Sequence, residues 1–321
     1  MGREYDALIM TTASDFVRVQ NNYHRLVRNL EADRIIFVGS EEVGQLVNKA
    51  SLGARVAFIN ENEIIPFADV HAVMTEQMES LLLGRELPRG VTGWYYQQFL
   101  KMQYALLCDK EYYMVWDGDT IPCGPFSMFK DETDIPYMDL KREYHEEYFV
   151  TMGRLLPGMK KCIEKSFIAE HMLIRSDIMK ALIQDIENNI LIEGKCFWEK
   201  IIRSIEAERI QESSFSEFET YGTYVCFNYT DSYRLRDWHS FRQGGEFFDP
   251  DKIKDEDYLW LSRDFFAISF EKGHFVRADH KNLFDNKRYQ EKMSARQMLE
   301  IAQEEFKDGY KEIWDSQRDV M

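Results

Sequence analysis

Short apolar runs alternate with amphipathic segments in the first part of the chain. Residues 6–12, 34–38 and 55–59 are short and apolar, which is typical of buried strands. Residues 16–30 and 41–50 instead repeat apolar side chains near helical spacing. Strands that alternate with helices through short connections predict an α/β fold with a mainly parallel sheet and helices on both faces.

Polar side chains follow the predicted strands at the edge where such a sheet binds ligands, beyond the carboxyl ends of its strands. Thr11 and Thr12 close the first strand, and the apolar run 112–116 leads directly into a D-x-D turn made by Asp117 and Asp119. Carboxylates one residue apart are hard oxygen ligands, which Mg²⁺ or Mn²⁺ accepts while keeping positions open for a diphosphate. An ordinary acidic turn, in which Asp bonds its own backbone, is the alternative.

A helix is predicted to begin at Gly93, before the D-x-D strand, and to run to about Cys108. Gln97, Lys101 and Tyr104 share one of its faces, because residues three and four apart are neighbours on a helix. This polar stripe carries one cation and would contact a nucleotide or its phosphates. A solvated helix face is the alternative.

The second half of the chain has a mostly helical pattern. Glu170 and His171 stand within the apolar stretch 167–174, which we expect to be helical. Because buried polar groups need partners, the two residues either satisfy each other and the backbone or line a binding site. A histidine of the core, with no ligand, is the plainer alternative.

Ser216 and Glu219 have the spacing of a capping box. This spacing predicts that Glu217 and Glu219 occupy the first turn of a helix. Carboxylates there stabilise the helix through its dipole, so capping alone is one sufficient explanation of both acids.

Beyond residue 245 the chain becomes more polar, with a predicted strand at 265–270 and a terminal helix over 288–314. It contains no internal repeat and no Ser- or Gly-rich linker. We therefore expect one compact domain, residues 1–245, with a helical C-terminal extension, residues 246–321, packed on it.

The composition narrows the class of protein. The 321 residues are 45% hydrophobic, enough for a large core, and the net charge is −16, which repels nucleic acid and anionic lipid. The five cysteines are odd in number and form no C-x-x-C pair, so reduced thiols in the cytoplasm are expected. The N-terminal residues include no long apolar segment, and no apolar run is long enough to span a bilayer. We expect a soluble or at most peripheral protein that does not bind nucleic acid.

Four ordered motifs carry a family resemblance: G-W-Y-Y-Q-Q-F-L-K-M at 93–102, V-W-D-G-D-T-I-P at 115–122, S-F-I-A-E-H-M at 166–172 and F-S-E-F-E-T-Y-G at 215–222. The chain resembles a largely uncharacterised family of bacterial GT-A-fold glycosyltransferases from gene clusters for surface polysaccharide. The resemblance implies a hexosyltransferase with a nucleoside-diphosphate sugar donor, a UDP-sugar first among them, and Mn²⁺ or Mg²⁺. The acceptor would be a saccharide or a lipid-linked saccharide. A lipid-linked acceptor would bring this cytoplasmic protein to the inner face of the membrane.

The resemblance also implies roles for particular residues. Asp117 and Asp119 match the metal-binding D-x-D of the family, with Asp119 as the expected direct ligand and Asp117 directed to the metal or to the donor. Glu217 or Glu219 would be the general base that takes the proton of the acceptor hydroxyl. Related folds often supply a third metal ligand from a late histidine, for which His274 and His280 are the candidates, although neither lies in a matched motif. The residues expected at the donor or acceptor are Thr11, Thr12, Gln97, Lys101, Asp117, Glu170 and His171.

Two other functions stay open. A sugar nucleotidyltransferase also uses a parallel sheet and paired aspartates, but that class usually has a Gly-rich loop after its first strand. Residues 11–16 read T-T-A-S-D-F and contain no glycine, which counts against that class. The other alternative is a non-catalytic saccharide-binding protein of the same fold.

Overall fold

The computed structural model describes residues 4–130, 133–276 and 286–305. The described residues divide into two compact units that alternate along the chain. The first unit takes those within Met1–Ala13, Ala32–Asp117 and Ser127–Trp238, and the second takes those within Ser14–Glu31, Gly118–Phe126 and His239–Met321. The division into a domain of residues 1–245 and an extension of residues 246–321 stays a prediction.

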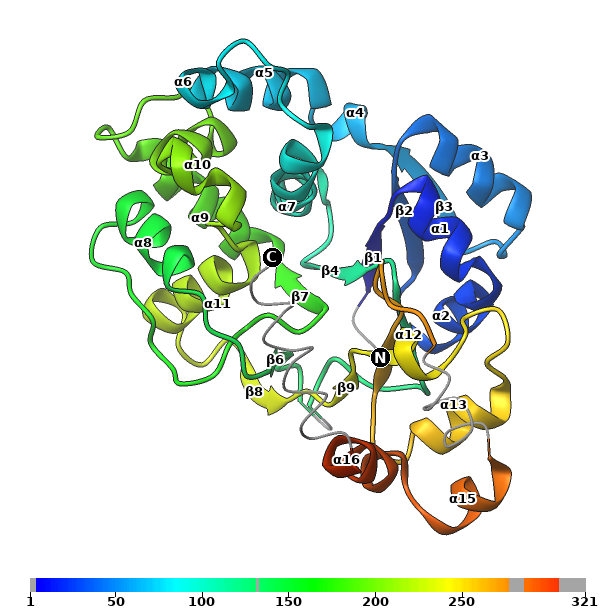
Figure 1. Ribbon diagram of the computed structural model, residues 1–321. Helices are drawn as coiled ribbons and strands as arrows, with labels where there is room; N and C mark the ends of the chain where they lie inside the picture. Colours follow the sequence, from blue (N-terminus) through cyan, green and yellow to red (C-terminus); the bar gives the residue numbers. More distant parts are fainter. Residues whose placement is uncertain (1–3, 131–132, 277–285, 306–321) are drawn as a thin grey trace. The chain divides into compact units, whose positions relative to one another are not determined.

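The first unit is built on a five-stranded sheet in the order β3-β2-β1-β4-β7 (Figure 1). Strands β1 to β4 are parallel and β7 is antiparallel to β4, so the predicted mainly parallel α/β sheet is confirmed. A separate parallel pair joins β6 and β8. The strands of this unit are β1 (Tyr5–Met10), β2 (Arg34–Gly39), β3 (Val56–Asn60), β4 (Tyr112–Asp117), β6 (Tyr137–Leu140), β7 (His171–Arg175) and β8 (Arg234–Asp237).

Helices flank this sheet because successive side chains of a strand point to opposite faces. Leu8 of β1 and Val115 of β4 face the large apolar core, which they share with helices α5, α7, α9, α10 and α11. On the other face, Phe58 of β3 packs against Gly44 of α3. The helices are α3 (Glu41–Ala50), α4 (Glu61–Ile64), α5 (Phe67–Gln77), α6 (Glu79–Leu82), α7 (Arg89–Leu107), α8 (Glu146–Leu155), α9 (Ser176–Asn188), α10 (Phe197–Ser204), the 3₁₀ helix η2 (Ala207–Glu212) and α11 (Glu217–Asn228).

The predicted helix over residues 167–174 is wrong. Residues 171–175 form strand β7, in which His171 pairs with Trp116 and Arg175 with Tyr112 of β4. Glu170, immediately before the strand, has a φ of +53° and turns the chain into it. A short, continuously apolar run fits a buried strand as well as a helix, and pairing with β4 decided between them.

The second unit contains a small sheet in the order β5-β10-β9 and seven short helices among its described residues. The helix predicted over 16–30 is interrupted by a 3₁₀ turn, and the predicted terminal helix is two helices as far as residue 305. The remainder of that helix lies outside the described residues. The elements are α1 (Ala13–Val19, from its second residue), η1 (Gln20–Asn22), α2 (Tyr23–Asn29), β5 (Thr120–Pro122), β9 (Ser240–Phe241), α12 (Gly244–Phe247), α13 (Asp255–Leu261), β10 (Ala267–Ser269), α15 (Lys287–Lys292) and α16 (Ala295–Glu305).

Candidate active site at the carboxyl edge of the sheet

The carboxyl ends of β1 and β2 meet closely at the edge of the first unit's sheet. The Thr11 N–H donates to the carbonyl of Val38 at 3.2 Å. A Cβ atom on Gly39 would lie 2.6 Å from the Thr11 carbonyl oxygen, so only glycine permits this approach. The Thr11 hydroxyl donates to the Thr12 carbonyl at 3.2 Å. Thr11 and Thr12 therefore lie at the predicted ligand edge, while their role at a nucleotide stays a prediction.

Asp117 is the last residue of β4, at the same edge. Its N–H donates to the carbonyl of Glu170 at 2.9 Å, which ties it to the residue before β7. Its Oδ1 lies 3.1 Å from Nζ of Lys101 on α7, and its side chain is 36% exposed. The backbone and one carboxylate oxygen are thus held in place while the side chain remains partly accessible.

Lys101 is the centre of a buried ion-pair cluster. Only 4% of its side chain is exposed, and Nζ lies 3.1 Å from Asp117 and 2.9 Å from Oε1 of Glu217. The same Nζ lies 4.6 Å from the centre of the Phe218 ring, where a cation is attracted to the aromatic face. Burial disfavours the charged amine, but Asp117 and Glu217 outweigh it and raise the pKa of Lys101 above its ordinary value. The alternative of a solvated helix face is therefore wrong for Lys101, whereas Gln97 is half-buried.

Glu217 and Glu219 begin α11, as the capping-box spacing predicted. Oγ of Ser216 accepts from the N–H of Glu219 at 3.2 Å, which caps the helix. The Glu217 N–H donates to Oε1 of Gln98 at 3.0 Å, whereas the Glu219 carboxylate accepts from the N–H of Phe167 at 3.3 Å. Burial raises the pKa of Glu219, although hydrogen bonds to its carboxylate act in the opposite direction. The two acids thus have different environments, with Glu217 bound to a cation and Glu219 bound to neutral donors.

Glu170 and His171 do not pair with each other. Glu170 forms an ion pair with Lys141 and accepts from the indole N–H of Trp238 at 3.1 Å. His171 is buried, with Nδ1 2.7 Å from the carbonyl of Ala169 and Nε2 2.9 Å from Oδ2 of Asp139.

Asp139 binds two side chains at once, those of Arg236 and His171. The guanidinium of Arg236 donates to both of its oxygens, at 2.6 and 2.7 Å, while His171 faces Oδ2. Both ring nitrogens of His171 face oxygen acceptors, so each donates when the ring carries two hydrogens. Burial would raise the pKa of Asp139, but Arg236 and His171 outweigh it and hold the pKa below its ordinary value. This cluster of Asp139, His171 and Arg236 matches the plainer expectation for His171, a histidine of the core.

Asp119 lies in the second unit, where the chain enters β5. Its Oδ2 is 3.9 Å from Nη2 of Arg18, its side chain is 26% exposed, and its carbonyl accepts from the N–H of Phe270 at 2.9 Å. The Tyr23 hydroxyl donates to the carbonyl of Gly118 at 2.9 Å and so holds the middle residue of the D-x-D.

The D-x-D offers oxygen donors for a divalent ion. Within the described residues, no three His, Cys, Asp or Glu side chains gather in a metal-binding arrangement. His274 is half-buried, and its Nδ1 has no hydrogen-bond partner in the described part of the chain. His280 lies outside the described residues. The carboxylates of Asp117 and Asp119 suit Mg²⁺ or Mn²⁺ in chemistry, and any further ligand stays a prediction.

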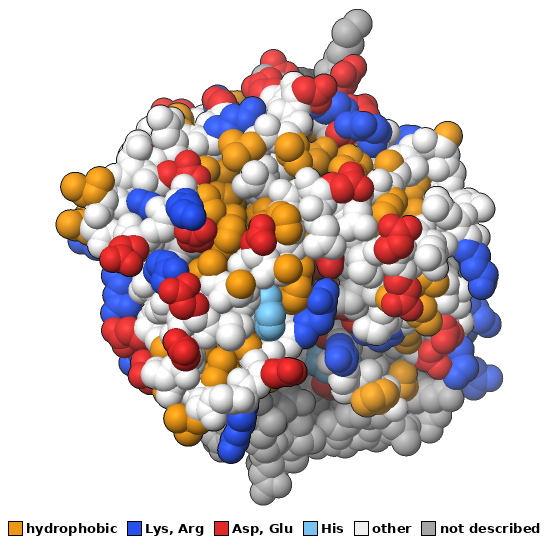
Figure 2. Space-filling model, turned by 90° about the horizontal axis from the view of Figure 1, so that it is seen from above, with side chains coloured by type: hydrophobic (Ala, Val, Ile, Leu, Met, Phe, Trp, Pro, Cys, Tyr) orange, Lys and Arg blue, Asp and Glu red, His pale blue; other side chains and the backbone are white. Residues whose placement is uncertain are grey.

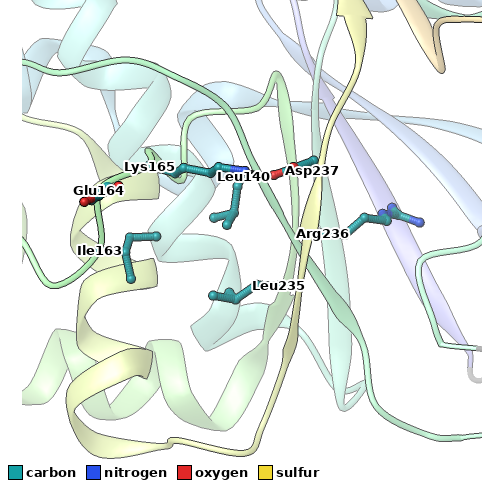
Figure 3. A pocket seen from close by; sticks show the side chains of 7 residues that line it. All are labelled: Leu140, Ile163, Glu164, Lys165, Leu235, Arg236 and Asp237. Atoms are coloured by element: carbon teal, nitrogen blue, oxygen red, sulfur yellow. Dashed lines mark hydrogen bonds and ion pairs between the residues drawn. The ribbon is translucent and has the colours of Figure 1, made fainter.

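A cavity of about 520 Å³ opens beside the ends of β6 and β8 (Figure 3). Its cations already have carboxylate partners, because Lys165 pairs with Asp237 and Arg236 binds Asp139. The face seen in Figure 2 likewise mixes acidic, basic and apolar side chains. The lining residues of the cavity are Leu140, Ile163, Glu164, Lys165, Leu235, Arg236 and Asp237.

Several of these contacts involve residues that the sequence did not single out. Asp139, Lys141 and Trp238 belong to no recognisable spacing, and Arg18 lies on a helix far from the D-x-D in sequence. Each acquires its partner only when distant segments pack together. The polar stripe of α7 and the motif at 93–102 were the sequence signals that pointed to Lys101.

An α/β protein with an aspartate at the carboxyl end of a central strand of its sheet is the class that these observations define. Residues 24–290 match the family of unknown function DUF6492, so the chain belongs to this family. In a comparison of sequences, no curated protein matches the chain. Among the described residues, no helix has both the length and the apolar character needed to cross a membrane.

Solved structures similar to this chain include three glycosyltransferases. Mouse xyloside xylosyltransferase 1, in its apo form, is 11% identical, with 85% of this chain and 100% of that chain covered and a TM-score of 0.41. The mannosyltransferase Ktr4p of S. cerevisiae, in complex with GDP, is 12% identical, with 72% and 69% covered and a TM-score of 0.42. The galactosyltransferase LgtC, in complex with donor and acceptor sugar analogues, is 11% identical, with 89% and 94% covered and a TM-score of 0.40. Scores below 0.5 at such identities assign no activity or substrate to this chain.

Proposed function

We propose that this protein is a metal-dependent glycosyltransferase. It moves a hexosyl group from a nucleoside-diphosphate sugar, a UDP-sugar in the first instance, to a saccharide or lipid-linked saccharide in bacterial surface polysaccharide synthesis. The observation that carries the proposal is Asp117, held by Lys101 at the carboxyl edge of the sheet and followed two residues later by Asp119. The reaction would take place in the cytoplasm, at the inner face of the membrane when the acceptor is lipid-linked.

Asp119 would hold the metal, while Asp117 would hold the metal or the donor. The family resemblance favours Asp119 as the direct ligand, and one oxygen of Asp117 is bound to Lys101. Lys101, Asp117 and Glu217 together carry one positive and two negative charges, and a nearby divalent cation would offset the excess. Bound Mn²⁺ or Mg²⁺ would stabilise the charge that develops on the departing nucleoside diphosphate.

Other residues at this edge would bind and orient the substrates. Thr11 and Thr12 would lie beside the nucleotide at this edge, and Gln97 would offer it an amide. Glu170 fixes the backbone of Asp117, and His171 supports the adjacent strand, so we assign both a positioning role.

The acid–base step needs a carboxylate that accepts the proton of the acceptor hydroxyl as this oxygen attacks the anomeric carbon. Burial raises the pKa of Glu219, which favours its carboxylate as the proton acceptor. Glu217 is bound to Lys101 and would instead orient that cation. We therefore propose Glu219 as the base and Glu217 as a positioning residue.

A panel of nucleotide-sugars tests the proposal. The protein would be incubated with each sugar in the presence of Mn²⁺ or of EDTA, and nucleoside diphosphate release and thermal shift would be measured. Metal-dependent release of nucleoside diphosphate supports transfer. Pyrophosphate chemistry with a nucleoside triphosphate would indicate a nucleotidyltransferase instead, and failure to bind any nucleotide-sugar would exclude both enzymes.

A further inference from the structure

A second cavity of the first unit, about 400 Å³ in volume, has the lining of a sugar-binding site. It lies between the start of α7 and the end of η2 with the residue that follows it, and the half-buried Trp94 is one of its walls. Trp94 meets Tyr95 edge to face, with ring centres 4.7 Å apart, so the indole is supported from within the protein. An aromatic surface with a few polar groups around it is the usual lining of a small-molecule pocket.

The polar groups around Trp94 are available to a ligand. The indole N–H of Trp94, the amide of Gln211 and the hydroxyl of Ser213 form no hydrogen bond to another residue in the part of the chain that the structure describes. Tyr95 has the opposite role, because its hydroxyl donates to the carbonyl of Ile210 at 2.7 Å and accepts from the N–H of Ser214 at 3.0 Å. Hydrogen bonds of Tyr95 therefore hold the walls of the cavity in place, while side chains of the lining keep donors and acceptors for a ligand.

The cavity is connected to Asp117 through helix α7. Trp94, Gln97 and Lys101 lie three and then four residues apart, so they share one helix face. Seven residues of helix separate Trp94 from Lys101 by about 10 Å, and Lys101 is bound to Asp117.

The chain between η2 and α11 runs beside the same helix. Tyr95 bonds Ile210 and Ser214, and Gln98 accepts from the N–H of Glu217. Helix α7 and the segment 210–217 therefore have the cavity at one end and the Lys101 ion pairs at the other. Gln97, between the two ends, makes no hydrogen bond within the described residues.

We propose that this cavity binds a sugar ring of an oligosaccharide, stacked on Trp94 with its hydroxyl groups on Gln211 and Ser213. A pyranose ring has an apolar face of C–H groups and a rim of hydroxyls, which matches an indole surrounded by amide and hydroxyl groups. That this oligosaccharide is the acceptor rests on the proposed function. Because Trp94 lies about 10 Å from Lys101 along α7, the ring bound on Trp94 would then be a sugar further along the oligosaccharide than the one that accepts the transferred group.

Binding to an array of immobilised neutral and acidic oligosaccharides tests the site. The full-length protein is expected to bind at least one glycan, and Trp94→Ala is expected to weaken that binding by about tenfold or more. Trp94→Phe keeps an aromatic surface and should retain part of the binding. Trp198→Ala, which removes another half-buried tryptophan on α10 outside the cavity, should leave it unchanged.

The outcomes separate this proposal from the proposed function. Absence of glycan binding by the wild-type protein, or equal binding by a folded Trp94→Ala variant, would overturn the sugar site even if nucleotide-sugars bind. Glycan binding that depends on Trp94, in a protein that releases no nucleoside diphosphate, would keep the sugar site and reject the transferase. Thermal unfolding of each variant shows whether a loss reflects misfolding.

Discussion

Asp117 and Asp139 both belong to the first unit and both bind cationic side chains, yet their surroundings differ. Asp139 is buried, and its hydrogen bonds within the described residues join it to Arg236 and His171, which enclose it. Asp117 lies at a strand end, is 36% exposed, and shares its one cation, Lys101, with Glu217. Two carboxylates share the single cation Lys101 at an accessible edge, whereas the one carboxylate of Asp139 is enclosed by Arg236 and His171. A binding site and a structural ion-pair network are distinguished here by charge balance and access rather than by residue type.

The largest effect is expected from the D-x-D itself. Asp119→Ala should lower turnover by about 10³-fold or more, because the ion that offsets charge on the leaving diphosphate loses a ligand. The free energy of unfolding should change little, since the side chain is partly exposed. Release of nucleoside diphosphate with Mn²⁺ measures the first effect and urea unfolding the second. Asp177→Ala, at an exposed ion pair with Arg175, is the matched control, and full activity in Asp119→Ala would remove the D-x-D from the mechanism.

At Asp139 we expect a loss of stability, in contrast to the loss of turnover expected at Asp119. Asp139→Asn should lower the free energy of unfolding by about 3 kcal/mol, because it leaves Arg236 and His171 without their anionic partner. Asp177→Asn, whose ion pair is exposed, should cost less than about 1 kcal/mol. Chemical denaturation of the three proteins measures both changes. Equal stability of the two variants would contradict a stabilising role for the contacts of Asp139 with Arg236 and His171.

Substitutions of Glu217 and Glu219 on α11 should differ in their effects on turnover. Glu219→Gln is expected to lower turnover by about 100-fold, since it removes the proposed base. Glu217→Gln should affect turnover less than tenfold but weaken nucleotide binding, because Lys101 loses one of its two anionic partners. Turnover and thermal shift with a nucleotide-sugar separate the two effects. Equal and mild effects would leave both residues as helix caps.

The smallest expected effect is on how the free energy of unfolding depends on pH. The pKa of Asp139 is lower in the folded protein than its ordinary value, so the unfolded chain binds this proton first as the pH falls. The stability that Asp139 supplies is therefore complete above its ordinary pKa and is lost as the pH falls below that value toward the folded one. Urea unfolding between about pH 7 and about pH 3 should show a steeper loss in the wild type than in Asp139→Asn. If stability fell equally with pH in the wild type and in Asp139→Asn, the pairing of Asp139 with Arg236 and His171 would be contradicted.

The alternation of short apolar runs with helical periodicity predicted β1 to β4 and the position of Asp117 at a strand end. The same periodicity wrongly predicted a helix at residues 167–174, because a short apolar run has too little length to distinguish strand from helix. It also missed the burial of Lys101, because a polar stripe on a helix has the same spacing whether it faces water or a carboxylate. Asp139 had no spacing signal at all, since its partners come from β7 and β8.

The sequence by itself determined the alternating order of strands and helices, the carboxylates at the D-x-D turn and the helix start at Ser216. These features depend on neighbours a few residues away, so local periodicity and turn chemistry suffice to predict them. Only the tertiary structure decided that Lys101 binds Asp117 and Glu217, that His171 binds Asp139, and that Trp94 lines a cavity beside Gln211. Those contacts join segments far apart in the chain, and packing of the apolar core, rather than any local preference, brings them together.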